Sequence, residues 1–165
     1  NGVKEGKYVA KVGSTKYETL AEAIAAANAG DTITLLANVA EFEGAVITKN
    51  LTFDFGDYTI TGKAGATVLH VKNAKVTLNG KTGGIDGGAG GDNIAVRADT
   101  GAEVIINGGV YTVGADAKGL GNSTVYVTDN GKVTINGGTF SSKAAYNGKY
   151  YVLNVLPRRL PSEAA

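Results

Sequence analysis

The amino-acid sequence predicts an all-β fold, a right-handed, single-stranded parallel β-helix of about four to five coils. Three near-identical phrases, VTLNGKTGG, VIINGGVYT and VTINGGTFS, begin at Val76, Val104 and Val133, with spacings of 28 and 29 residues. Between them lie short alternating runs and corners rich in Gly, Asn and Asp, with no helical pattern. A repeat of this length, with about three strands and no helix, excludes ankyrin, tetratricopeptide and leucine-rich designs.

The repeat also predicts which side chains stack. Alternate residues of each strand point into a central column, so we expect Val76, Val104 and Val133 to lie above one another in register. An earlier run that begins at Leu51 matches the first phrase at a spacing of 25 residues. Each phrase continues with an asparagine at a predicted corner, where a left-handed backbone or a bond to the backbone is needed. These asparagines can also hydrogen-bond to one another along the column: Asn79, Asn107 and Asn136.

The beginning of the chain differs from the rest. Residues 8–12 alternate like a strand, and Thr19 and Glu22 match a capping box. We expect a helix over residues 21–28, stopped by Gly30, because this segment is rich in alanine. Its apolar face should close the open end of the first coil: Leu20, Ile24 and Ala27. We therefore divide the chain into an N-terminal strand-helix capping unit, residues 1–38, and the coils, residues 39–165, which together make one continuous domain.

Composition excludes several classes of function. The 165 residues carry a formal net charge of +1, which gives no field to attract nucleic acid. The absence of cysteine excludes disulfides and cysteine metal sites. No apolar run is long enough to span a bilayer, so we expect no membrane insertion.

Enzymes that hydrolyse polysaccharides typically use a pair of carboxylates, and a basic side chain can abstract a proton in a lyase. This chain offers five aspartates, an arginine and a lysine for such a role: Asp86, Asp92, Asp99, Asp116, Asp129, Arg97 and Lys118. Three of the aspartates lie in turn contexts, and no two form a close pair in one strand. His70 is the only histidine, and alternation places it on the solvent side of its strand. We expect no catalytic residues, no metal and no cofactor.

The glycine-rich stretch GGIDGGAGGDN, residues 83–93, invites comparison with a phosphate-binding loop. It lacks the Gly-Lys-Ser/Thr ending, and no helix follows it, so a phosphate site is not expected there. We interpret it as a flexible corner between coils.

Tyrosine provides the candidate binding surface. Eight tyrosines occur without any tryptophan, and outward tyrosines on a rigid sheet can stack on sugar rings or anchor a protein interface. The expected face consists of Tyr111, Tyr126 and Tyr146. The alternative is that these are ordinary strand residues, since strands favour tyrosine.

The last predicted strand provides a candidate assembly interface. It is strongly apolar, and Pro157 ends it, so an uncapped coil should expose its core there. The interface residues are Tyr150, Tyr151, Leu153 and Leu156. We expect self-association, with a trimer favoured, or a place in a larger fibre or capsid, or a continuation of the chain that covers this end.

The segment YVAKVGSTKYETLAEAIAAANAGDTITLLANV and the INGGTF phrases resemble the pectate-lyase-like right-handed parallel β-helix superfamily, over residues 7–155. Modules of this kind occur in bacterial surface proteins and phage structural proteins. The resemblance implies an extracellular, non-enzymatic structural or adhesive module on a bacterial surface or a virion. Because the fold hosts enzymes as well as inert fibres, two alternatives stay open. One is an inactive or partial polysaccharide lyase or hydrolase, and the other is a carbohydrate-binding module that holds surface glycans on its tyrosine face.

Overall fold

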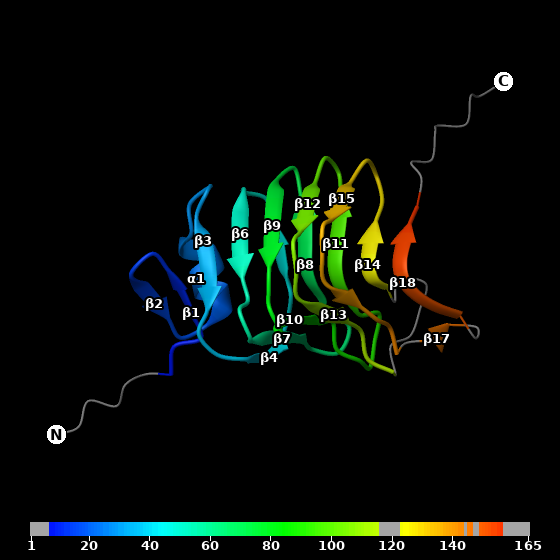
Figure 1. Ribbon diagram of the computed structural model, residues 1–165, viewed down its shortest axis with the longest axis horizontal. Helices are drawn as coiled ribbons and strands as arrows, with labels where there is room; N and C mark the ends of the chain where they lie inside the picture. The colour runs from blue at the N-terminus through cyan, green and yellow to red at the C-terminus, as the bar shows by residue number, and fades with distance from the viewer. Residues whose placement is uncertain (1–6, 116–122, 144, 147–148, 157–165) are drawn as a thin grey trace.

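The computed structural model describes residues 7–115, 123–143, 145–146 and 149–156. Three parallel sheets form the sides of a β-solenoid of about four turns, which runs along the long axis of the molecule (Figure 1). The chain visits sheets A, B and C in a fixed order, so strands of successive coils are neighbours. The predicted all-β parallel β-helix is confirmed.

The strands are short, and each coil contributes one to every sheet. Sheet A contains β3 (Thr32–Leu35), β6 (Leu51–Asp54), β9 (Lys75–Asn79), β12 (Glu103–Ile106) and β15 (Lys132–Ile135). Sheet B contains β4 (Val39–Phe42), β7 (Thr59–Gly62), β10 (Gly84–Asp86), β13 (Val110–Thr112) and β16 (Thr139–Phe140). Sheet C contains β5 (Ala45–Ile47), β8 (Thr67–Lys72), β11 (Ile94–Asp99), β14 (Ser123–Val127) and β18 (Lys149–Val155), with β17 (Ala145–Tyr146) antiparallel beside β18.

The register follows the sequence repeat. Val104 pairs with Val76 on one side and with Val133 on the other. Leu51 pairs with Val76, so the earlier run belongs to the same column. Val76 and Val104 are completely buried, and Val133 packs against the core from the last coil. The predicted inward stack of valines is confirmed.

The predicted left-handed corners lie elsewhere in the phrase. Positive φ angles occur at Gly109 (105°) and Gly138 (111°), two residues after the asparagines. The prediction that the asparagines themselves adopt this conformation is wrong, because glycine reaches it without a steric cost. The asparagine side chains stack on one another instead, through hydrogen bonds between coils.

The N-terminal end is closed by a hairpin and a helix. Strands β1 (Ala10–Val12) and β2 (Thr15–Tyr17) extend sheet A in the antiparallel sense beyond β3. Helix α1 (Leu20–Ala26) begins with the predicted capping box, in which Thr19 and Glu22 bond to each other's backbone. The expected apolar face is buried in the core: Leu20, Ile24 and Ala27.

The helix is shorter than predicted. It ends at Ala26, and extended backbone at Ala27 stops it before Gly30 is reached. The solenoid also begins inside the segment assigned to the capping unit, since β3 is already the first strand of sheet A with a parallel neighbour. No described helix is long and apolar enough to cross a bilayer.

The glycine-rich stretch is a corner only in part, since residues 87–93 connect β10 to β11 while residues 84–86 form a strand. It contains β10, which pairs with β7 and β13, and Ile85 at its centre is completely buried. A Cβ atom on Gly84 would collide with the backbone carbonyl of Val110 in the next coil. The glycines here therefore allow neighbouring coils to approach closely.

Candidate functional site

A line of three large polar and aromatic side chains crosses the outer face of sheet C. His70 in β8 pairs in register with Arg97 in β11, and Arg97 pairs with Tyr126 in β14. The three residues are separated by about one coil repeat each, so the solenoid places them side by side. All three side chains are partly buried. The residues directly before and after each of them in the strand are buried and face the core.

Asp99, the last residue of β11, is bonded to two of these side chains. Its side chain is 3% exposed, and Oδ2 lies 2.7 Å from His70 Nε2 and 3.0 Å from Arg97 Nε. Lys72 Nζ lies 4.0 Å from Oδ1 of the same carboxylate. We refer to His70, Lys72, Arg97, Asp99 and Tyr126 as the Asp99 cluster.

The guanidinium group of Arg97 is held from two directions. Asp99 accepts from Nε, and the Tyr126 ring lies under the group, with 5.4 Å between Arg97 Cζ and the ring centroid. Among the described residues, the two terminal nitrogens of Arg97 have no hydrogen-bond partner. Because Arg97 is 33% exposed, this free edge is accessible from solvent.

The electrostatics of the cluster favour an ionised Asp99. Burial by itself raises the pKa of the carboxyl, but the hydrogen bond and charge of His70, the hydroxyl of Thr100 and the charge of Arg97 together outweigh it. The net result is a pKa below the ordinary value for aspartate. One carboxylate thus lies beside a lysine, an arginine and an imidazole, so the two cations outnumber the one anion.

The aspartates have different roles. Asp86 accepts from the backbone nitrogen of Gly88, as its turn context predicts. Asp99 does begin a turn, because its carbonyl oxygen accepts from the backbone nitrogen of Ala102 at 3.0 Å, but its side chain binds His70 and Arg97. Asp92 and Asp129 are exposed, while Asp116 and Lys118 lie outside the described residues. In the described part of the chain, no three His, Cys, Asp or Glu side chains are placed to hold a metal ion.

His70 differs from its prediction in one respect. It does lie on the outer face, but its side chain is only 16% exposed because it is bonded to Asp99. The signal that could have found this pair is the spacing of 29 residues between them, which is one coil repeat.

The predicted tyrosine face is wrong in one of its three members. Tyr111 is completely buried, donates to the carbonyl of Gly108 at 2.8 Å and stacks on Phe140 in the core. Burial raises its pKa. Tyr126 does lie on the outer face, and the side chain of Tyr146 lies outside the described residues. The described chain therefore offers one of the three predicted tyrosines to a ligand.

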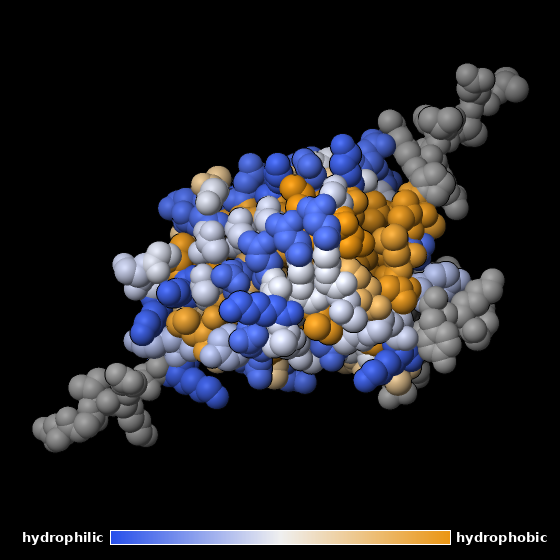
Figure 2. Space-filling view, viewed as in Figure 1, coloured by the Kyte–Doolittle hydropathy of each residue, from blue (hydrophilic) through white to orange (hydrophobic). Residues whose placement is uncertain are grey.

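The C-terminal coil exposes residues whose counterparts form the core. Ile135 pairs with Ile106 and is 43% exposed, whereas Ile106 is completely buried. Val155 pairs with Val127 and is 58% exposed, whereas Val127 is 6% exposed. Apolar surface gathers at this end of the molecule (Figure 2).

The predicted interface residues fall on this coil. Leu153, which pairs with the buried Val125, and Leu156 are both about half exposed, and Tyr151 is partly buried. Tyr150 belongs to β18, but its side chain lies outside the described residues. In the described part of the chain, β15 and β16 have no partner on their outer side, and β17 covers only the beginning of β18.

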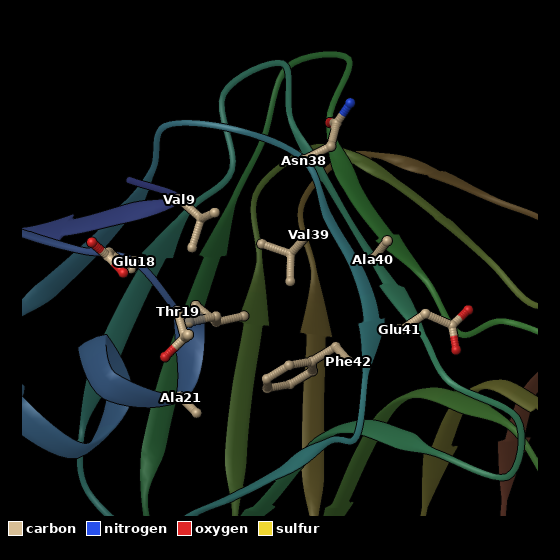
Figure 3. A pocket seen from close by; sticks show the side chains of 10 residues that line it. Val9, Glu18, Thr19, Ala21, Asn38, Val39, Ala40, Glu41 and Phe42 are labelled. Atoms are coloured by element: carbon tan, nitrogen blue, oxygen red, sulfur yellow. The ribbon is translucent and has the colours of Figure 1, made fainter. Parts of the chain in front are cut away.

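The N-terminal end has a different character. A half-open hollow of about 290 Å³ lies between α1 and β4, with Val39 and Phe42 projecting into it and Glu41 pointing away (Figure 3). The edge of β4 is interrupted by an irregularity between Val39 and Phe42, where Glu41 has a φ of 53°. An edge with a bulge and an exposed charge resists pairing with another strand.

No protein-family model matches the chain, and no curated protein or solved structure is similar enough to provide a match. The structure itself defines the class, a parallel β-solenoid with a helical N-terminal cap. The function is inferred below from the residues of this chain.

Proposed function

We propose that this protein is a non-enzymatic structural module, a rigid β-solenoid that self-associates through its C-terminal coil. The observation that carries the proposal is the contrast between the two ends. At the N-terminal end, β1 and β2 cover the edge of sheet A, α1 covers the core, and an irregularity interrupts the edge of sheet B, so that among the described strands only β5 leaves a regular open edge. At the C-terminal end, core-register residues and strand edges are exposed in the described chain.

The exposed coil combines two features that drive association. Apolar side chains gain about 25 cal/mol for each Å² removed from water, so burying roughly 400 Å² contributes on the order of 10 kcal/mol before the costs of association. Unpaired backbone groups at strand edges add a template for hydrogen bonding to another strand. Both favour a partner that continues or covers the coil.

The arrangement of the ends also limits the kind of assembly. A head-to-tail fibre would require the C-terminal edge of sheet A to pair with an N-terminal edge that β1 and β2 already occupy. Contact between the C-terminal coils of two or three copies meets no such obstacle. A small closed oligomer, such as the trimer expected from the sequence, therefore fits better than an open fibre.

The proposal also includes a lack of enzymatic activity and an extracellular location. The Asp99 cluster contains one carboxylate rather than a pair, and no Ser, Thr or Cys, which supports a non-catalytic role. An extracellular position, on a bacterial surface or a virion, is supported by the resemblance of the N-terminal segment to modules found there.

Two valines with the same exposed fraction provide a matched experiment. Val155 in β18 and Val46 in β5 are each 58% exposed, but they lie at opposite ends of the solenoid. Sedimentation equilibrium of the unmodified chain should show an oligomer at micromolar concentration. Val155→Asp should shift it towards monomer, and Val46→Asp should leave the mass unchanged. A monomeric unmodified chain, or equal effects of the two substitutions, would overturn the proposal.

A further inference from the structure

The Asp99 cluster has features of a binding site that the assembly role does not use. Its central carboxylate is almost completely buried and holds His70 and Arg97 through hydrogen bonds, whereas Lys72 lies 4.0 Å away and is 41% exposed. An arginine fixed through Nε and by an aromatic ring keeps its terminal nitrogens at a constant orientation. A fixed guanidinium edge is suited to bidentate binding of an oxyanion.

We propose that the Asp99 cluster binds a tetrahedral oxyanion, a phosphate or sulfate group, on the outer face of sheet C. The free edge of Arg97 would hold two of its oxygens, and Lys72 would hold a third. In the described part of the chain, neither cation forms an ion pair with any carboxylate other than Asp99. Their joint charge exceeds that of the one carboxylate, which leaves the cluster able to accept an anion.

The position of Lys72 favours a tetrahedral anion over a carboxylate. Lys72 comes from β8 and Arg97 from β11, and both approach the same carboxylate, so their charged groups converge from adjacent strands. A carboxylate ligand has only two oxygens, both of which the Arg97 edge would occupy. A phosphate or sulfate group has further oxygens for the ammonium group.

The test is a titration of the full chain at fixed pH and ionic strength. Binding is measured by the changes in amide chemical shifts in ¹⁵N–¹H NMR spectra. Inorganic phosphate and inorganic sulfate are added in separate arms, and acetate is added in a third. We expect saturable shifts at the amides of His70, Arg97 and Tyr126 with phosphate, with sulfate or with both, and weaker binding of acetate. The two tetrahedral arms identify which group the site prefers.

Variants then locate the binding. Arg97→Gln should weaken it by roughly tenfold or more, as expected for loss of a charge-assisted hydrogen-bonded pair. Arg97→Lys keeps the charge but loses the two-nitrogen edge, so it should also bind more weakly, and it serves as the deciding variant if Arg97→Gln does not fold. Lys16→Gln is the control, because Lys16 also lies over a tyrosine ring, at 5.9 Å from the centroid of Tyr8, but without a buried carboxylate.

Three outcomes of the titrations and of the Arg97→Lys variant would overturn the inference, and a fourth comes from the control. They are the absence of saturable shifts in both tetrahedral arms, binding by Arg97→Lys equal to that of the unmodified chain, and acetate binding as tight as that of phosphate and sulfate. A loss of binding in Lys16→Gln would also contradict it, because the site would then lie elsewhere.

Discussion

Asn107 Nδ2 donates a hydrogen bond to Asn79 Oδ1 at 3.0 Å, across 28 residues of sequence and one turn of the solenoid. Asn136 makes the same bond to Asn107 at 2.9 Å. The repeated phrase thus produces a short ladder of amides along the outside of the coils. This ladder ties the register of three coils together, because the middle amide, Asn107, donates to one neighbour and accepts from the other.

Replacing the middle asparagine tests the ladder. Asn107→Ala removes two bonds that are exposed to solvent, and we expect a loss of about 1–2 kcal/mol in the free energy of unfolding. Urea denaturation measures this loss. Asn28→Ala is the control, since Asn28 is exposed and its side chain makes no hydrogen bond in the described part of the chain. Equal effects of the two substitutions would show that the ladder contributes nothing specific.

A second prediction compares two isoleucines at the same register position. Ile106 is completely buried, and its partner Ile135 in the last coil is 43% exposed. Ile106→Ala should cost about 2–5 kcal/mol, and Ile135→Ala in the monomer should cost less than about 1 kcal/mol. Denaturation at low protein concentration provides the comparison. Similar losses at both positions would mean that the C-terminal coil is covered.

Substitution of Gly84 tests whether neighbouring coils need to approach closely in sheet B. An added Cβ would meet the Val110 carbonyl, so Gly84→Ala should destabilise the protein at the upper end of the roughly 1–3 kcal/mol range for overpacking. Gly13→Ala is the comparison, because Gly13 has a φ of 58° but open space around it. This substitution should lower the free energy of unfolding by about 1–2 kcal/mol, through backbone strain alone. A mild effect at Gly84 would indicate that the strand can shift outward.

The Asp99 cluster predicts a loss of stability in acid. Because the pKa of Asp99 is lower in the folded state than in the unfolded chain, its contribution is fully present above the unfolded value of about 3.9. The contribution is lost as the pH falls through the lower folded-state pKa. The stability difference between the unmodified chain and Asp99→Asn should therefore narrow between about pH 5 and pH 2. Urea denaturation across this range measures it, and a constant difference would contradict the prediction.

The sequence was informative where the repeat is regular. The spacing of 25–29 residues predicted the column through Val104 and the stacking of asparagines, because a solenoid converts a fixed spacing into adjacency. It did not reveal β10, since Gly84–Asp86 has no alternation of its own, and pairing with β7 and β13 makes it a strand.

The sites were harder to predict, because burial depends on which way a strand faces. A strand of three residues such as β13 carries too little pattern to show that Tyr111 points inward and Val110 outward. The pairing of His70 with Asp99 is hidden for another reason. The local context of neither residue indicates it, and only their separation of one repeat brings them into contact.

Hydrogen exchange measured at several protein concentrations tests the central claim most directly. If the C-terminal coil is the assembly surface, amides of Lys132–Ile135 and Lys149–Val155 should exchange more slowly as the concentration rises. Amides of Val39–Phe42 and Ala45–Ile47, at the edges of the N-terminal end, should exchange at a constant rate. Protection that appears at the N-terminal strands instead, or exchange that is independent of concentration at both ends, would contradict the account.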